Sequence, residues 1–595
     1  MDPHIIKFLR EEKNMAFSES PAITVKEIDA SGVVPNVSSS TGGTVGQYRW
    51  GPLNQATLVS NEAGLVEKFG TPDAITSVDF HSAAFFLKYT NALQVVRVGD
   101  AACVNSFAHD SAPGVSDGGG GTAVQITDAD NFDNQKGTLD AAKHTFLSRW
   151  PGSLGNSLKI SMCGHSTNTD SAYTNWAYKN QFDQAPGTSA HAENIGALND
   201  EVHVAVIDSD GEFSGTRGTV LETHSFTSLA SDAKNADGST NNIKDVINRT
   251  SQYVWMAGYP NHYQATNAGT AAALSKDYQI GNGGHVQEFA LDSGGNGSIG
   301  TAQMLTGFDQ LQDKDQIQVD FLICPDTANQ TDNITVVNDI VSIAQGTRKD
   351  CVAVASPARA NIVGSTTPVT SSVTNAASYT SSSYLVVDNN YLKVYDKYND
   401  NFIHIPAASS TAGVMAATDA NAAAWFSPGG PRRGQYLGVT GIAYSPNKGE
   451  RDTLYRNGIN PIANIPGQGL LLFGDKTKLN RPSAFDRINV RRLFLVIERA
   501  IALAARNVMF EFNDEFTRAE FTGIVEPFLR EVKGRRGITD FRVICDETNN
   551  TSSVVDRNEF VATILVKPAR SINFVTLNFV AVRSGVDFTE VAGTV

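Results

Sequence analysis

The sequence INVRRLFLVIERAI occupies residues Ile488–Ile501, in the most regular part of the chain. Its apolar residues recur at helical spacing, and the members of this stripe are Val490, Leu493, Phe494, Ile497, Ala500, Ile501 and Ala504. This period is that of an α-helix that buries one face. The pattern therefore predicts a helix over Val490–Arg506.

A second helix and a small sheet are predicted to follow. Asn513 or Asp514 suits the N-cap of a helix that runs to Lys533, and Pro527 is expected to kink it. Apolar strands are predicted at Phe541–Cys545, Glu559–Val566 and Ile572–Val582. We therefore expect an α/β module, the C-terminal core domain, over residues 467–583, with a polar tail at 584–595.

Two further α/β segments are predicted upstream. Strand, helix and strand alternate at Gln318–Cys324, Asn333–Gln345 and Cys351–Ala355. Nearer the start, two helices and a strand are predicted at Asn61–Phe69, Asp79–Tyr89 and Leu93–Val98. These patterns predict an N-terminal α/β part at residues 30–108 and a middle α/β domain at 317–466.

The region between these segments has a different composition. Asp110–Gly121 is a turn-rich break, and isolated strands such as Glu201–Ile207 follow among many loops. A helix is also expected at Asp140–Leu147. We predict one or two β-rich outer domains inserted at residues 109–316. The expected fold class is multidomain, α+β with α/β parts.

Composition excludes several classes of partner. The formal net charge is -15, so the chain should repel nucleic-acid phosphates and anionic membranes. No run of 18 apolar residues occurs, so no membrane span is expected. Five scattered cysteines show no zinc-ligand spacing and suit reduced thiols in a cytoplasm.

No sequence motif predicts catalysis, and we expect no enzyme activity, metal or cofactor. Gly295, Gly297 and Gly300 fit GxGxxG, but no βαβ context or following helix is expected. The stretch Asp208–Gly211 resembles a calcium loop only faintly and is predicted to be a turn.

Three arginines in the Val490–Arg506 helix form a periodic set. Arg492, Arg499 and Arg506 recur every seven residues and are predicted to lie opposite the apolar stripe. In an acidic chain this basic stripe could face an acidic partner surface. A solvated helix face is the alternative.

The order of several segments resembles contractile phage tail sheath proteins. The matching segments are SPAITVKEID (20–29), TVGQYRWGPLNQATLVSN (44–61), VEKFG (66–70), RWPGSLGNSLKI (149–160), VLETHSFTSL (220–229), VDFLICPD (319–326), GINPIANIPGQGLLLFGDKTK (458–478), INVRRLFLVIERAI (488–501) and FEFND (510–514). The resemblance covers both ends and most of the centre of the chain.

The resemblance implies a structural subunit that polymerises as a helical sheath of stacked rings around an inner tail tube. Contraction of the sheath would drive the tube through a host envelope. The implied partners are further copies of the chain, the tube protein, and baseplate and tail terminator proteins. The basic stripe would then face the inner tube or a neighbouring subunit. The implied location is the virion tail, assembled in the host bacterial cytoplasm.

The resemblance also implies that terminal arms link neighbouring subunits. Residues 1–29 would hold the N-terminal extension and arm, with strand residues Ile23, Val25, Glu27 and Ile28. The C-terminal linking strand would hold Ile572, Phe574, Val575, Leu577 and Phe579. Ordinary strands within one subunit are the alternative.

Two other functions remain open from sequence. One is the sheath of a phage-derived, pyocin-like injection particle, which would use the same mechanism. The other is a virion surface adhesin or decoration protein, which would bind a discrete ligand and form no helical polymer.

Overall fold

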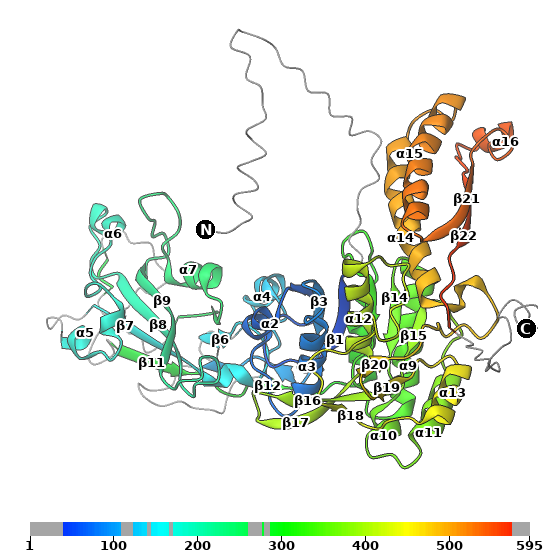
Figure 1. Cartoon of the computed structure of the whole chain (residues 1–595). Helices are drawn as coiled ribbons and strands as arrows, with labels where there is room; N and C mark the ends of the chain where they lie inside the picture. Colours follow the sequence, from blue (N-terminus) through cyan, green and yellow to red (C-terminus); the bar gives the residue numbers. More distant parts are fainter. Residues whose placement is uncertain are drawn as a thin grey trace, which may run out of the picture. The chain divides into compact units, whose positions relative to one another are not determined.

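The computed structural model describes residues 40–108, 123–139, 144–165, 171–259, 276–278 and 286–573. Helices and sheets are mixed along the chain, and the predicted multidomain α+β class is confirmed (Figure 1). Ala500–Lys567 belongs to one compact unit, here called the C-terminal unit. The described residues up to Arg499, and those from Pro568 onward, belong to the other, here called the main unit.

A six-stranded sheet forms the centre of the main unit. Its strand order is β15 (Leu385–Val387), β14 (Val352–Ala355), β13 (Phe321–Ile323), β1 (Gly42–Gly46), β3 (Leu93–Arg97) and β2 (Ala56–Val59). All neighbours pair in parallel except β2, which is antiparallel to β3. The N-terminal and middle α/β segments predicted from sequence thus share one sheet, with β1 between β13 and β3.

Helices cover both faces of this sheet, as a parallel sheet requires. One face packs against α2 (Glu62–Phe69), α3 (Ser77–Phe86), α12 (Ala408–Asn421) and the start of α14 (Ile488–Ala505). The other face packs against α8 (Thr301–Asp309), α9 (Gln330–Ser342) and α11 (Pro368–Ala377). Strand β13 contributes to both cores, because Phe321 and Ile323 point to one face and Leu322 to the other.

The inserted region is rich in strands. An antiparallel sheet has the order β11 (Val286–Ala290), β7 (Leu158–Gly164), β8 (Glu201–Asp208) and β9 (Thr219–Ser228). A smaller sheet contains β10 (Val254–Met256), β6 (Phe146–Ser148) and β5 (Phe107–Ala108). The helix expected up to Leu147 is wrong at its end, because Leu147 pairs with Phe107 and Trp255 in this sheet.

Smaller elements complete the main unit beyond β15. A three-stranded sheet has the order β17 (Asn401–Pro406), β16 (Tyr391–Asp396) and β18 (Gly441–Ile442). A hairpin joins β19 (Ile462–Ile465) to β20 (Gly469–Leu472), preceded by helix α13 (Lys448–Arg456). The short helices in and beside the insertion are α4 (Ala129–Gln135), α5 (Ser171–Asn175), α6 (Ala190–Asn194) and α7 (Ile243–Thr250).

The C-terminal unit contains two long helical segments and one pair of strands. The last residues of α14 lead to α15 (Glu515–Gly534), which Asp514 caps through its side chain and which includes Pro527. Strands β21 (Ile538–Ile544) and β22 (Thr563–Pro568) form a two-stranded sheet, and the short helix α16 (Ser552–Val555) lies between them in sequence. The helices predicted over Val490–Arg506 and up to Lys533 are confirmed within two residues.

Three of the five residues of strand β1 (GGTVG) are glycines, at positions whose surroundings leave little room for a side chain. A Cβ atom at Gly42 would lie 2.6 Å from the ring of Phe86, and one at Gly46 would lie 2.9 Å from Asp79 Cβ. Contacts this short force neighbouring groups to move. The glycines therefore let helices approach the central strand closely.

We predict that Gly42→Ala lowers the free energy of unfolding by roughly 1–3 kcal/mol, because the added methyl group overpacks the core. Gly137→Ala is the matched control, since no atom lies within 4 Å of its added Cβ. Chemical denaturation of both variants measures the difference. Equal stability of the two variants would contradict this account of β1.

Candidate functional site

The structure describes one of the nine predicted linking-arm residues. Ile572 is described and is 84% exposed. The other predicted arm residues lie outside the described residues; they are Ile23, Val25, Glu27, Ile28, Phe574, Val575, Leu577 and Phe579. The candidate site is the part of the main unit from which each terminal segment departs.

Arg492 lies inside the main unit. Its guanidinium pairs with the carboxylate of Asp419 on α12 and lies 4.2 Å from the ring centroid of Phe321. The residue is buried. Arg492 therefore fastens α14 to the central sheet and to α12.

Arg499 is the last main-unit residue of α14. It pairs with Asp320, and its Nη2 donates to the backbone carbonyl of Asp350 at 2.8 Å. Asp320 also accepts the backbone N–H of Thr41 at 2.9 Å. Burial raises the pKa of Asp320, and the charge of Arg499 opposes that rise. One buried carboxylate thus holds both the residue before β1 and the end of the main-unit part of α14.

The predicted partner-facing stripe is wrong for Arg492 and Arg499. Helical spacing places them away from the apolar stripe, but the sheet and α12 also cover that side of α14, and aspartates neutralise both charges. Arg506 is exposed and lies in the C-terminal unit. A partner-facing role for Arg506 stays a prediction.

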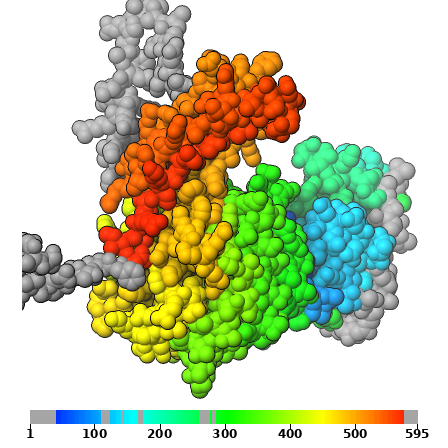
Figure 2. All heavy atoms as spheres, turned by 90° about the vertical axis from the view of Figure 1, so that its right-hand side faces the viewer, coloured from blue at the N-terminus to red at the C-terminus, as the bar shows by residue number. Residues whose placement is uncertain are grey.

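Asp475 anchors the start of the C-terminal segment. Its carboxylate accepts hydrogen bonds from Ser571 Oγ at 2.7 Å and Asn573 Nδ2 at 2.9 Å, and it pairs with Arg487 at 3.1 Å. Burial alone would raise its pKa, but these bonds and the arginine charge bring the pKa below the ordinary 3.8. Figure 2 shows the last described residues, in red, reaching the yellow surface. The carboxylate stays ionised at neutral pH and holds residues 571–573 on the main unit.

A buried arginine joins the inserted region to the central sheet. Arg97, the last residue of β3, donates to the backbone carbonyls of Tyr48 at 2.8 Å, Gly51 at 2.7 Å and Pro151 at 2.6 Å. Tyr48 and Gly51 lie in the segment that connects β1 to β2, whereas Pro151 belongs to the inserted region. Burial lowers the pKa of Arg97. The three carbonyls replace the water that its guanidinium loses on burial.

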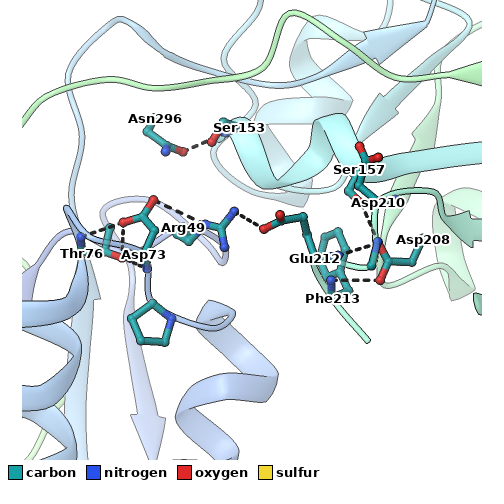
Figure 3. A network of polar contacts seen from close by, with 12 residues as sticks. Arg49, Asp73, Thr76, Ser153, Ser157, Asp208, Asp210, Glu212, Phe213 and Asn296 are labelled. Atoms are coloured by element: carbon teal, nitrogen blue, oxygen red, sulfur yellow. Dashed lines mark hydrogen bonds and ion pairs between the residues drawn. The ribbon is translucent and has the colours of Figure 1, made fainter. Parts of the chain in front are cut away.

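Further polar contacts extend this joint (Figure 3). Arg49 lies between Asp73, at 3.5 Å, and Glu212 of the inserted region, at 2.7 Å. Asp208 accepts the backbone N–H groups of four consecutive residues, from Gly211 to Ser214, at 2.8–3.0 Å. This geometry is a turn, as predicted for Asp208–Gly211, and it places Glu212 opposite Arg49.

The glycine motif does not form a nucleotide site. Helix α8 does begin directly after Gly300, so the expectation that no helix follows is wrong. However, the hollow of about 230 Å³ at this helix start is lined by Asp79, Asp326 and Asp332. Burial and the charge of Asp326 raise the pKa of Asp79 to about 7. Carboxylates at this position disfavour a pyrophosphate group.

Neither a metal-binding cluster nor a membrane-spanning helix is present in the part of the chain that the structure describes. Within it, no group of three or more His, Cys, Asp or Glu residues has the geometry of a metal site. Within the same residues, no helix combines the length and the apolar character needed to span a membrane.

Three family domains match separate parts of the chain. The phage tail sheath C-terminal domain matches residues 480–581, the phage tail sheath protein central domain matches 297–478, and the tail sheath protein Gp18 domain III N-terminal region matches 40–98. The tail sheath protein of Vibrio phage KVP40 is 31% identical over 96% of this chain and 99% of its own length. That of Enterobacteria phage T4 is 32% identical over the same shares. The chain belongs to the phage tail sheath protein family.

Solved structures of sheath proteins share the fold of this sheath subunit. The sheath tail protein from Listeria innocua has a TM-score of 0.52 at 12% identity, over 90% of this chain and 96% of that one. The sheath tail protein from Desulfitobacterium hafniense has a TM-score of 0.51 at 13% identity, over 92% and 100%. The resemblance inferred from sequence is confirmed, and the chain is a structural subunit of a contractile tail sheath.

We predict that Arg499→Ala lowers the free energy of unfolding of the main unit by roughly 3–5 kcal/mol, because Asp320 is left buried without its partner. Lys136→Ala is the control in the same unit, since Lys136 forms an exposed ion pair with Asp133 at 2.8 Å. Its loss should stay below about 1 kcal/mol. Denaturant titration compares them, and losses of similar size would show that the Asp320 pair does not hold α14.

Proposed function

We propose that this sheath subunit polymerises as a helical jacket of stacked rings around an inner tail tube, and that contraction of the jacket drives the tube through the host envelope. The observation that carries the proposal is the two-stranded sheet of the C-terminal unit. A lone pair of strands is marginal in water. The role is structural rather than catalytic.

The strand pair β21–β22 has two strand edges at which further strands could pair. Exposed and partly exposed residues alternate along β22, and Leu565 is 52% exposed. Thr539 Oγ1 donates to the carbonyl of Lys567 at 3.1 Å, linking the two strands. Extended segments from neighbours could add strands at the open edges and cover such apolar side chains.

The proposed donors are the two arms named from sequence. The N-terminal arm would use Ile23, Val25, Glu27 and Ile28, and the C-terminal strand would use Ile572, Phe574, Val575, Leu577 and Phe579. Both arms depart from fixed points, because Thr41 is held by Asp320 and residues 571–573 are held by Asp475. A strand given to the next subunit is a head-to-tail contact that repeats without closing.

This arrangement supports a mechanism for contraction. Backbone hydrogen bonds between arms and strand pairs would keep neighbours connected, while side-chain contacts between main units exchange one packing for another. The extended sheath would be trapped kinetically until the baseplate releases it. The ion pairs of Arg492 and Arg499 would let each main unit move as one body.

The proposed partners are further copies of the chain, the inner tail tube protein, and baseplate and tail terminator proteins. Nucleic acid is not a proposed partner, in line with the net charge of -15. Assembly is proposed in the host bacterial cytoplasm, which suits the five free cysteines.

Negative-stain electron microscopy of the purified chain, alone and with its tube protein, tests the proposal. We expect tubular polymers or jackets around the tube. A chain that begins at residue 40 should keep the stability of the main unit but form at least tenfold fewer tubes, because it lacks the N-terminal arm. Discrete particles from the full chain even with tube protein present would contradict the proposal.

A further inference from the structure

The loop between α14 and α15 presents an unusual group of exposed aromatic side chains. Phe510, Phe512 and Phe516 are 101%, 84% and 76% exposed. Met509 beside them is 58% exposed. Isolated exposed apolar residues are common, but four large ones within eight residues form a patch that a soluble subunit would normally cover. Residues 509–516 are called the aromatic loop below.

Contacts within the C-terminal unit hold this loop in shape. Arg518 Nη1 donates to Asn513 Oδ1 at 2.9 Å, and Asn513 Nδ2 donates to the carbonyl of Glu559 at 2.8 Å. Phe510 has a φ of 69°, a conformation that bulky residues rarely adopt. The aromatic rings are thus presented outward on a supported loop.

The aromatic loop is also acidic. Glu511, Asp514 and Glu515 lie among the aromatic residues, and residues 507–517 contain no lysine or arginine. Asp514 is occupied as the cap of α15. Glu511 and Glu515 are exposed and can face a partner. A surface that covers this loop should therefore be apolar with a basic rim.

The main unit carries a hollow with that chemistry. It has a volume of about 420 Å³, and its lining includes Tyr455, Pro461, Phe473 and Ile572 together with the basic residues Lys448 and Arg451. Phe473 is 46% exposed and Ile572 84% exposed. Among the described residues, neither Lys448 nor Arg451 forms an ion pair with a carboxylate. The lining also includes two carboxylates, Asp452 and Asp475, and Asp475 is paired with Arg487.

We propose that the aromatic loop of one subunit docks into this hollow on a second copy of the chain, with Glu511 and Glu515 facing Lys448 and Arg451. Charge complementarity favours a second copy. A loop and a hollow on one chain that fit each other make a head-to-tail contact, which extends into an open polymer. The inference rests on the proposed helical assembly and adds a side-chain contact to it.

Two charge-reversed variants test the contact. The loop variant carries Glu511→Lys and Glu515→Lys, and the hollow variant carries Lys448→Glu and Arg451→Glu. Each alone should form at least tenfold fewer tubes than the unmodified chain, because like charges then face each other. Mixing the two variants should restore tubes, since each basic loop meets an acidic hollow and each acidic loop a basic one. Combining all four changes in one chain should also restore them.

A control variant with Lys314→Glu and Arg456→Glu changes the net charge as much as the hollow variant does, at exposed residues that do not line the hollow. It should form tubes normally, and unfolding curves should show all variants folded. Full tube formation by each single variant would overturn the docking proposal alone. If the four-fold variant forms tubes but the mixture does not, the loop contacts the hollow of its own subunit, which overturns docking between copies. If the single variants form tubes normally alone and fail only to coat the tail tube, the loop contacts the tube protein instead. An unmodified chain that forms no tubes would instead contradict the proposed function.

Discussion

The buried carboxylate of Asp320 is the interaction on which the organisation of the subunit depends. It accepts the backbone N–H of Thr41, next to the central strand β1, and pairs with Arg499, where α14 leaves the main unit. Burying a carboxylate is costly unless charged and hydrogen-bonded partners surround it. The residue before β1 and the end of the main-unit part of α14 are therefore fixed at one point of the core.

The two units differ in how much of their sheet and apolar surface is covered by their own residues. The six-stranded sheet of the main unit has helices on both faces, and Arg97 and Arg49 join the inserted region to it through short polar contacts. Among the described residues, the sheet of the C-terminal unit has two strands, and this unit exposes Leu565 and the aromatic loop. The main unit of such a subunit is complete by itself, whereas the sheet of its C-terminal unit can take strands from neighbouring subunits. Contacts of this kind can extend into an open helical polymer.

Local sequence patterns predicted much of the fold, because helices and strands are set by nearby residues. The apolar stripe of α14, the cap of α15 at Asp514 and the strand after Leu93 all follow from spacing within a few positions. The partners of the arginines could not be predicted in this way. Asp419 lies 73 residues from Arg492, and Asp320 lies 179 residues from Arg499. A helical wheel locates the apolar face, but it cannot show that a sheet covers another face as well. Local patterns likewise could not predict that Asp475 binds Ser571 and Asn573, which are distant in sequence, or that Phe510 is exposed.

Hydrogen exchange of the backbone amides of β21 and β22 tests the central claim most directly, when the free chain is compared with assembled tubes. Residues 538–544 and 563–568 should exchange at least tenfold more slowly in tubes, because added strands pair with their open edges. The amides of β13 and β14 should be protected equally in both states, since the central sheet is complete within one subunit. Equal exchange of β21 and β22 in the free and assembled chain would contradict the account, because the strand pair would then need no neighbour to complete it.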